Sequence, residues 1–589
     1  MSQAWRRHLT YYLRGMRAQR DDPDWFEGEW PQIQRAWIEI QHRSDEAIVA
    51  DFLFAALPSM APLGLWSTAI EWATLGLPLV RQAGNKLREG VLLDNLGHSH
   101  FLLGDRQRAL AIYEQALALA EANPGAVYEG PLLGRMGELH SEIGQPERAL
   151  EYLRRALAVA RRAKDHHGES QWLDRLGRVY LRLGQLEEAR QSFQIALDLA
   201  REFGYEASAG SALGNLGTYY LDTGDLEQAV SCFEDVLQIA RNSKDQHAEA
   251  TTLINLALAR RTAGDIRTCI EFYEQALAIA RQIGDRDNEN TCLGGLAGAY
   301  RVLGKVSTAL QYAEQALELA QTIGDADGEM SWLSELGSLH GMLGKNDQAL
   351  SCFSQALALA KGPASSLWHQ ETILGNLGNF YLTLGQVSEA RDCFKEALPL
   401  AEKIEDRAGQ CALTEGLAIT FAETGEKPRA AELYRQALAM ARKIPDRRRE
   451  ASLLSNLGIV LLDMGDLNGA LANQQQALYI FKEIGDIGSA SMTLVALAIT
   501  HAAGDDVEQA LHHYHQAIDL AQQSGDWRSE ATSSWNLGML LGQKGEFQGA
   551  VAFLGRAVDL EQIHGHSNAP NHALVLAQVE AMLTETEEA

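Results

Sequence analysis

Asparagine recurs at one fixed place in this sequence, directly before a leucine that returns about every forty residues. The positions are Asn95, Asn215, Asn255, Asn376, Asn456 and Asn536. Asparagine is a mediocre residue for the middle of a helix, because its side-chain amide competes for backbone hydrogen bonds. Its recurrence at one register position therefore indicates that the amide has a specific role.

Arginine forms a second pattern. Arg175, Arg178 and Arg182 are three and four residues apart, a spacing that places them on one stripe of a helix. Arg135 lies forty residues before Arg175, and Arg261 and Arg301 are related in the same way. Guanidinium groups bind carboxylates through charge-assisted, often bidentate hydrogen bonds. Two interpretations stay open: the stripe recognises acidic groups of a partner, or it is an ion-pair face neutralised by Glu138, Glu142, Asp174 and Asp222.

The residue patterns of common enzymes and metal sites are absent from the sequence. It contains no HExxH, GxSxG or GxxxxGK[ST] motif, and its six cysteines include no CxxC pair. His512, His513 and His515 share one predicted helix, but their spacing does not suit a metal site. We therefore predict no catalytic residues, no bound metal and no cofactor.

Composition limits the class of protein that can position these side chains. The 589 residues exceed what one hydrophobic core usually organises, and an apolar content dominated by Ala and Leu favours helices. The net charge of −27 disfavours binding to nucleic acid or to an anionic membrane. No apolar run is long enough to cross a bilayer, and the first residues lack the apolar core of a secretory signal. These features predict a cytoplasmic, all-α protein.

An internal period defines the helical elements. A Leu-Gly or similar pair occurs twelve times, from Leu96-Gly97 to Leu537-Gly538, at intervals of forty residues with one of forty-one. A glycine seven or eight residues after each leucine predicts a left-handed cap that ends a first helix. A second helix with small residues at fixed places follows, and recurrent aspartates such as Asp165 and Asp245 predict the N-caps of the next first helices. The unit is a helical hairpin.

The pattern of a small residue, Leu-Gly/Ala-x₂-Tyr, then Gly, then Ala-x₃-Tyr/Phe-x₂-Ala-Leu-x₂-Ala resembles the tetratricopeptide repeat in its forty-residue variety. Residues 214–240, GNLGTYYLDTGDLEQAVSCFEDVLQIA, are similar to repeats of kinesin light chain and of Leu-Gly-Asn repeat adaptors. The resemblance implies a right-handed superhelical solenoid of twelve to thirteen repeats, whose first helices line a concave groove that binds peptides. It also implies that the recurrent asparagines hold peptide backbone amides or carboxylates. The alternative for these asparagines is a structural hydrogen bond between neighbouring helices.

The two ends of the chain differ from the repeats. We expect a helical cap at 1–45, a degenerate repeat at 46–89, twelve repeats over 90–565, and a capping helix with a tail at 566–589. Residues 1–90 hold six of the eleven tryptophans. The segment DPDWFEGEWPQIQRAWIEI resembles the start of the repeat arm in bacterial signal-transduction ATPases, although no nucleotide-binding motif accompanies it.

The sequence therefore predicts a non-enzymatic scaffold for protein-protein interaction that binds extended or helical peptide segments, possibly acidic ones, in its concave groove. The alternative is a ligand- or inducer-sensing regulatory arm that acts on a separate effector. No oligomeric state is predicted. The candidate peptide-binding residues are Asn95, Arg135, Arg175, Arg178, Arg182, Asn215, Asn255, Arg261, Arg301, Asn376, Asn379, Asn456, Trp535 and Asn536.

Overall fold

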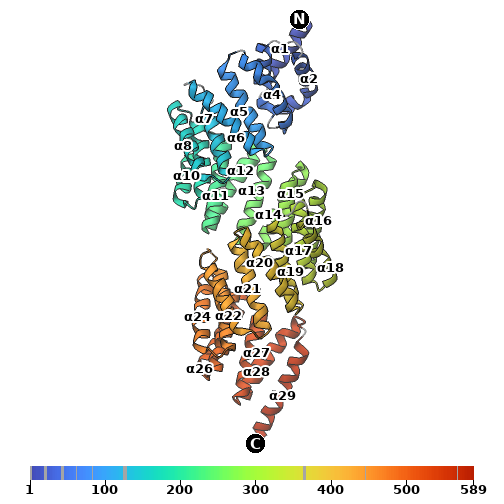
Figure 1. The fold of residues 1–589 in the computed structure, drawn as a ribbon. Coiled ribbons are helices and arrows are strands. Elements are labelled where there is room, and N and C mark those ends of the chain that lie inside the picture. Colours follow the sequence, from blue (N-terminus) through green and yellow to red (C-terminus); the bar gives the residue numbers. More distant parts are fainter. Residues whose placement is uncertain are drawn as a thin grey trace. The chain divides into compact units, whose positions relative to one another are not determined.

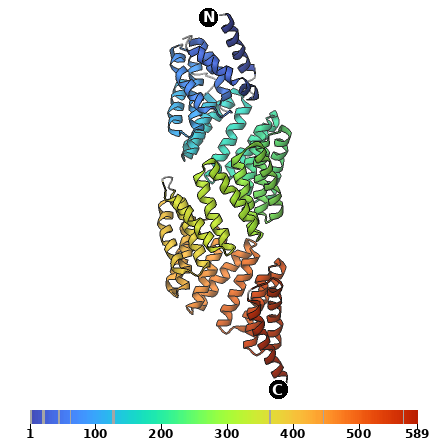
Figure 2. The same ribbon diagram turned by 90° about the vertical axis from the view of Figure 1, so that its right-hand side faces the viewer.

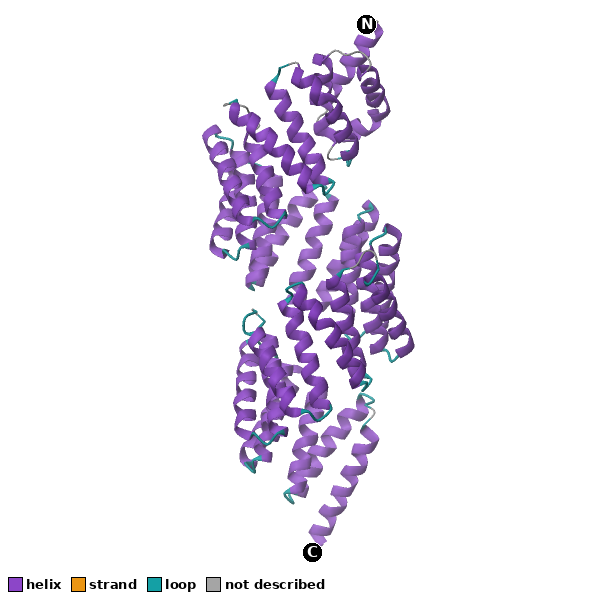
Figure 3. Ribbon diagram, viewed as in Figure 1, coloured by secondary structure: helices purple, strands orange, loops and turns teal. Residues whose placement is uncertain are grey.

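The computed structural model describes residues 3–18, 23–41, 46–60, 63–82, 84–123, 129–362, 366–444, 446–566 and 568–588. These residues form helices joined by short loops, with no strand among them (Figure 3). The chain divides into two compact units, Met1–Ala299 and Tyr300–Ala589. Figures 1 and 2 show each unit as a succession of helical hairpins.

The twelve predicted hairpins correspond to helices α5 to α28, and each hairpin has a first helix and a second helix. The first helices are α5 (Lys86–Leu102), α7 (Glu129–Glu142), α9 (His166–Arg182), α11 (Glu206–Thr223), α13 (Gln246–Thr262), α15 (Arg286–Val302), α17 (Ala326–Met342), α19 (Leu367–Thr383), α21 (Arg407–Glu423), α23 (Arg447–Asp463), α25 (Ile487–Ala503) and α27 (Trp527–Gln543). The second helices are α6 (Arg106–Ala122), α8 (Pro146–Ala163), α10 (Leu186–Phe203), α12 (Leu226–Ser243), α14 (Ile266–Ile283), α16 (Val306–Ile323), α18 (Asn346–Ala360), α20 (Val387–Lys403), α22 (Lys427–Ala441), α24 (Leu467–Glu483), α26 (Val507–Ser524) and α28 (Phe547–Ile563).

The Leu-Gly pair is explained by packing inside the hairpin. A Cβ added at Gly177 would lie 2.5 Å from the ring of Phe193, which is fully buried on the second helix. Gly217 and Phe233 have the same relationship. Glycine is therefore needed on the first helix because an aromatic ring of the second helix lies directly against its backbone.

The predicted caps are confirmed. Asp165 accepts a hydrogen bond from the backbone N–H of Gly168 at 2.9 Å, and Asp245 accepts one from Ala248 at 3.0 Å. The hairpin glycines adopt the left-handed conformation, as at Gly224 with φ 84°. Gly504 is the exception: its φ is −85°, and Asp505 takes the left-handed position with φ 61°. Gly504 lies seven residues after its leucine instead of eight, so the helix continues through it and the turn falls on the next residue.

Helices α1 (Gln3–Ala18), α2 (Pro23–Gln41), α3 (Glu46–Met60) and α4 (Trp66–Gln82) precede the hairpins, and α29 (Ala569–Glu588) follows them. The rings of Trp30 and Trp37 stack on Trp72, with centroids 5.5 and 4.9 Å apart. Aromatic packing thus builds the core of the first helices. The Trp5 side chain and residues 42–45, where the first predicted boundary falls, lie outside the described residues, and the predicted domain bounds stay a prediction.

First helices of successive hairpins contact one another, as α7 does with α9 and α9 with α11. In the described part of the chain, successive second helices do not make contacts of comparable extent. Within each unit the first helices therefore lie on the more tightly packed side of the stack. We call the surface they present the first-helix face.

Candidate functional site

Three of the six recurrent asparagines bind a side chain of the preceding repeat on the first-helix face. The Asn215 Nδ2 donates to Asp174 Oδ1 at 2.8 Å, and Asn456 Nδ2 donates to Glu415 Oε1 at 3.3 Å. In both pairs the acceptor lies 41 residues earlier in the chain. Two further pairs occupy the same register: Asn376 Nδ2 with Ser334 Oγ at 3.1 Å, and Arg135 Nη1 with Asp94 Oδ2 at 3.1 Å. These four side chains link neighbouring first helices.

The other three asparagines of the series lack such a partner. The residues 41 positions before Asn255 and Asn536 are Gly214 and Val495, and neither side chain can accept a hydrogen bond. Accordingly, neither asparagine has a side-chain hydrogen bond to any residue that the structure describes. Asn95 donates instead to the Val91 carbonyl of its own helix, at 2.8 Å. The repeat thus contains engaged and free amides at one register position.

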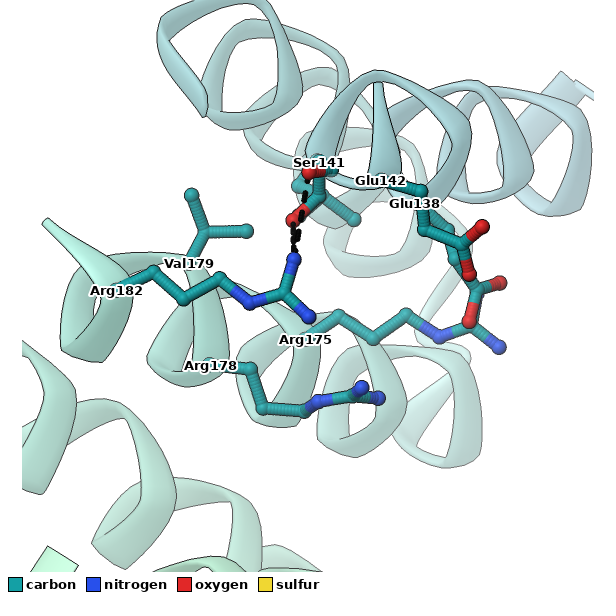
Figure 4. A pocket seen from close by; sticks show the side chains of 8 residues that line it. Glu138, Ser141, Glu142, Arg175, Arg178, Val179 and Arg182 are labelled. Carbon is teal, nitrogen blue, oxygen red and sulfur yellow. Dashed lines mark hydrogen bonds and ion pairs between the residues drawn. The ribbon is translucent and has the colours of Figure 1, made fainter. Parts of the chain in front are cut away.

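The arginine stripe of α9 borders a small cavity (Figure 4). The Arg175 Nη1 pairs with Glu138 Oε2, and its guanidinium lies 5.2 Å from the centroid of the Trp172 ring. The Arg182 Nη1 donates to Ser141 Oγ at 2.9 Å. The cavity measures about 40 Å³ and is lined by Glu138, Ser141, Glu142, Leu153, Arg175, Arg178, Val179 and Arg182.

Arg178 differs from the other two arginines of this stripe. Its side chain is exposed, and it forms no ion pair or hydrogen bond with any residue in the described ranges. Figure 4 shows its guanidinium directed away from Ser141, to which Arg182 is bound. Arg178 therefore presents an available cation beside two arginines that α7 already holds in place.

Burial shifts the pKa values of two groups near the arginine stripe, Asp174 and His98. Burial raises the pKa of Asp174, and the hydrogen bonds from Asn215 and Ser211 oppose that rise. Burial also lowers the pKa of His98 to about 4, and the nearby charges of Arg135 and Arg175 contribute to the decrease. His98 is therefore neutral near pH 7, and it adds no positive charge to this face.

The remaining candidates lie apart from this group. Arg261 is exposed and has no ion-pair partner among the described residues, whereas Arg301 Nε lies 3.3 Å from Glu335 Oε1. Asn379 is exposed and likewise has no hydrogen-bond partner among them. The Trp535 ring stacks on His572 of α29, with centroids 3.7 Å apart, so α29 covers one face of this indole.

Among the residues with described positions, no three His, Cys, Asp or Glu side chains are grouped so that they could hold a metal ion. No helix in the described ranges is long and apolar enough to span a membrane.

Models of a known protein family match most of the helical hairpins. One tetratricopeptide repeat family model matches residues 128–202, 208–282, 288–362, 369–443, 449–523 and 489–562, and a second matches 91–122. The matches cover well over half of the chain. The chain belongs to the tetratricopeptide repeat family. The predicted all-α tetratricopeptide array is thereby confirmed, and membership supports a role as a protein-interaction scaffold.

Solved structures similar to this tetratricopeptide repeat protein share little sequence with it. BtubC (BKLC) from P. vanneervenii is 20% identical, with 38% of this chain and 92% of that chain covered and a TM-score of 0.35. The quorum sensor NprR from B. thuringiensis is 16% identical, with 62% and 99% covered and a TM-score of 0.43. Kinesin light chain repeats from Podosopora anserina are 21% identical, with 33% and 98% covered and a TM-score of 0.30. No curated protein matches this chain.

The asparagine pattern by itself does not distinguish the amides that bind a neighbouring repeat from those that do not. The distinguishing residue lies 41 positions earlier, where Asp174 precedes Asn215 but Gly214 precedes Asn255. The repeat period contains this information, because it fixes which residues of successive first helices are neighbours. Ser141 and Ser211, which bind Arg182 and Asp174, belong to no recurrent motif.

Proposed function

We propose that this tetratricopeptide repeat protein is a non-enzymatic scaffold whose first-helix face, over α7 to α13, binds an extended peptide that carries acidic side chains. The observation that carries the proposal is the availability of Arg178 and Asn255. Both lie on first helices of the unit 1–299, and neither has a hydrogen-bond or ion-pair partner among the described residues. A cation and an amide are suited to a side-chain carboxylate and a peptide backbone, respectively.

Contacts between repeats support this arrangement. Arg175 and Arg182 are held by Glu138 and Ser141, so their positive charges lie next to Arg178 at little further cost in side-chain entropy. The engaged asparagines have a different role: Asn215 and Asn456 stabilise the stacking of first helices. The proposed peptide therefore contacts Arg178 on α9, and Asn255 and Arg261 on α13.

A titration with synthetic peptides tests this function. The probe is a nine-residue, end-blocked peptide of alternating Glu and Ser, and the reference peptide has Gln in place of Glu. We expect tighter binding of the Glu peptide, and at least about tenfold weaker binding by Arg178→Glu, because an attractive charge contact becomes repulsive. Fluorescence anisotropy at fixed ionic strength gives both dissociation constants.

The matched control is Arg162→Glu. Arg162 is exposed on the second helix α8 and has no ion-pair partner among the described residues, so its reversal changes the net charge equally but leaves the first-helix face intact. If both variants lost the same affinity for the Glu peptide, net charge alone would explain the effect, and the proposed site would be contradicted. Failure of the Glu peptide to bind in any form would remove the acidic-peptide preference.

The partner itself can be identified by affinity purification and mass spectrometry. Proteins captured by the parent chain and lost with Arg178→Glu/Asn255→Ala are candidates for the groove ligand. The sensing-arm alternative stays a prediction from the N-terminal resemblance. It requires a change of shape on addition of a small molecule or inducer protein, which solution scattering measures.

A further inference from the structure

At one position of the repeat, the type of residue differs between the early and the last repeats. The residue two places after the repeat leucine is His98, Glu138, Arg178 or Thr218 in the early repeats. In the last four repeats the same position is occupied only by large apolar residues. We call these the isoleucine stripe: Ile419 of α21, Ile459 of α23, Ile499 of α25 and Met539 of α27.

The isoleucine stripe is accessible to solvent. The exposed fractions of Ile459 and Ile499 are 46% and 41%, and Met492 on α25 is 48% exposed. Ile419 and Met539 are half-buried. The residue three places after each stripe residue is half-buried: it is small on α21, α25 and α27, as Ala422, Ala502 and Gly542, whereas on α23 it is Leu462, which adds apolar surface beside Ile459. Contiguous exposed apolar surface of this kind is uncommon on soluble proteins and indicates a binding surface.

Contacts between the four helices keep the stripe continuous within the unit 300–589. Helix α23 contacts α25, and α25 contacts α27. Helix α21 is linked to α23 by the hydrogen bond between Asn456 and Glu415, and Arg449 Nη1 also lies 3.8 Å from Glu415 Oε2. The apolar side chains therefore recur once per repeat on neighbouring helices.

The spacing of these side chains selects the conformation of a ligand. Packed helices lie about 8–10 Å apart, so the stripe presents one apolar side chain at about that interval. An α-helix places residues i and i+7 on one side about 10.5 Å apart, which is close to this interval. An extended strand directs side chains to one side every ~6.6 Å, which does not match it. A polyproline helix repeats every ~9.3 Å, but grooves that bind it are lined by aromatic rings, and this stripe is aliphatic.

Charge beside the stripe indicates the polar residues of the ligand. Glu423 and Asp463 are exposed at the C-terminal ends of α21 and α23. Asp463 pairs with Lys427 at 3.1 Å, whereas Glu423 has no ion-pair partner among the described residues. The C-terminal turn of α29 is acidic, so α29 of a second copy would be repelled by these carboxylates.

We propose that the isoleucine stripe binds an amphipathic α-helix of a partner protein, with apolar residues at seven-residue spacing and basic residues beside them. This surface belongs to the second unit and differs in chemistry from the acidic-peptide site on α7 to α13. Either site can therefore fail its test without affecting the other.

The test uses the full chain and three labelled synthetic peptides. The first is a 21-residue peptide with Leu at positions a and d of three heptads and Lys or Ala elsewhere. The second has the same composition in scrambled order, and the third is a proline-rich peptide of equal length and charge. The variant is Ile459→Ser/Ile499→Ser. The matched control is Ile563→Ser, because Ile563 is 74% exposed but lies on the second helix α28.

We expect the heptad peptide to bind the parent and the control alike, and to bind the double variant at least about tenfold more weakly, because two apolar contacts are lost. The scrambled and proline-rich peptides should also bind at least about tenfold more weakly. Equal binding of the scrambled peptide would show attraction by charge alone, and preferred binding of the proline-rich peptide would show a polyproline site. Either result, or an unaffected double variant, overturns the proposal.

A second measurement avoids substitutions in the protein. The heptad peptide carries a benzophenone amino acid at its central a position and is photo-crosslinked to the parent chain. Crosslinks should map to α21, α23, α25 or α27. Crosslinks confined to second helices or to the unit 1–299 would overturn the proposal even if the double variant lost stability.

Discussion

Asn215 and Asn255 occupy the same position of successive repeats, and the residue 41 places earlier decides what each amide does. Asp174 accepts from Asn215, whereas Gly214 offers Asn255 no acceptor. An amide already bonded to a carboxylate must give up that bond before it can bind a peptide. Identical residues in identical repeats therefore differ in their availability for binding.

Gly214→Asp should occupy the Asn255 amide with a carboxylate from its own chain. The loss of about one hydrogen bond corresponds to about 1 kcal/mol, so we expect binding of the Glu-Ser peptide to weaken about fivefold. Gly214→Asn supplies an acceptor without a charge, so it distinguishes the effect of the new hydrogen bond from the effect of the added negative charge. Gly214→Ala adds no acceptor, and apart from the backbone of its own helix no atom lies within 4 Å of the added Cβ, so this variant should bind the peptide as the parent does. Equal weakening in Gly214→Ala would contradict the proposed role of Asn255.

His98 predicts a dependence of stability on pH. The imidazole titrates near 6.5 in the unfolded chain and at about 4 in the folded protein, because burial disfavours its charged form. The unfolded chain therefore binds the proton more readily, and folding stability is lost as the pH falls from about 6.5 towards 4. His98→Gln should make the urea midpoint less sensitive to pH in this window. Parallel pH profiles for the parent and His98→Gln would contradict this.

At the scale of the helix, one side-chain contact to a glutamate, an ion pair from Arg or a hydrogen bond from Gln, recurs at the joints between hairpins. The last turn of a second helix binds a glutamate eight residues later in the first turn of the next first helix, as Arg161 binds Glu169 at 2.7 Å. The other joints of this kind are Arg81–Glu89, Arg241–Glu249, Arg281–Glu289, Gln321–Glu329, Arg442–Glu450 and Gln522–Glu530. These glutamates lie in the first turn of their helices, near the positive end of the helix dipole, and they also hold neighbouring hairpins together.

The joint between α10 and α11 departs from this pattern. Ala209 occupies the glutamate position, Tyr205 provides no side-chain cap, and a cavity of about 380 Å³ lies there. Arg201 Nη2 instead lies 3.2 Å from Asp235 Oδ2 on α12. This joint lacks both carboxylates that stabilise most of the others.

Ala209→Glu should stabilise this joint. The cavity provides room for the longer side chain, and a carboxylate near Arg201 and the α11 N-terminus should contribute about 0.5–1 kcal/mol. Hydrogen exchange of the backbone amides at the start of α11 measures this stabilisation, and we expect it to be slower in Ala209→Glu. Ala209→Gln fills the same space without the charge and should contribute less. Faster exchange in Ala209→Glu would show that the buried charge is not compensated.

At the scale of the whole molecule, the helices form an array in which contacts are local. Within each of the two units, every substantial contact between described helices joins elements that are adjacent or next but one in sequence. Stability in such arrays is approximately a sum over repeats and their interfaces. A perturbation at one end should therefore be felt mainly in the neighbouring repeats.

Removal of residues 566–589 tests this locality. Helix α29 packs on α28, and His572 both stacks on Trp535 and lies 2.9 Å from Glu561 Oε2. Without α29, hydrogen exchange should accelerate in α27 and α28 and stay unchanged in α5 to α14. His572→Ala should produce a smaller change at the same place. Uniform acceleration throughout the chain would contradict an additive array.

The sequence by itself determined the hairpin unit, the aspartate caps and most turn glycines, because these depend on residues close in the chain that recur with a fixed period. It placed Asn215 and Asn255 at equivalent positions but left their binding and structural roles as alternatives. Only the tertiary structure decided that Asp174 holds Asn215, that Glu138 and Ser141 hold Arg175 and Arg182, and that Arg178 has no described partner. The physical reason is that hydrogen bonds and ion pairs between repeats depend on the distance and direction between side chains of different helices, which helix packing sets.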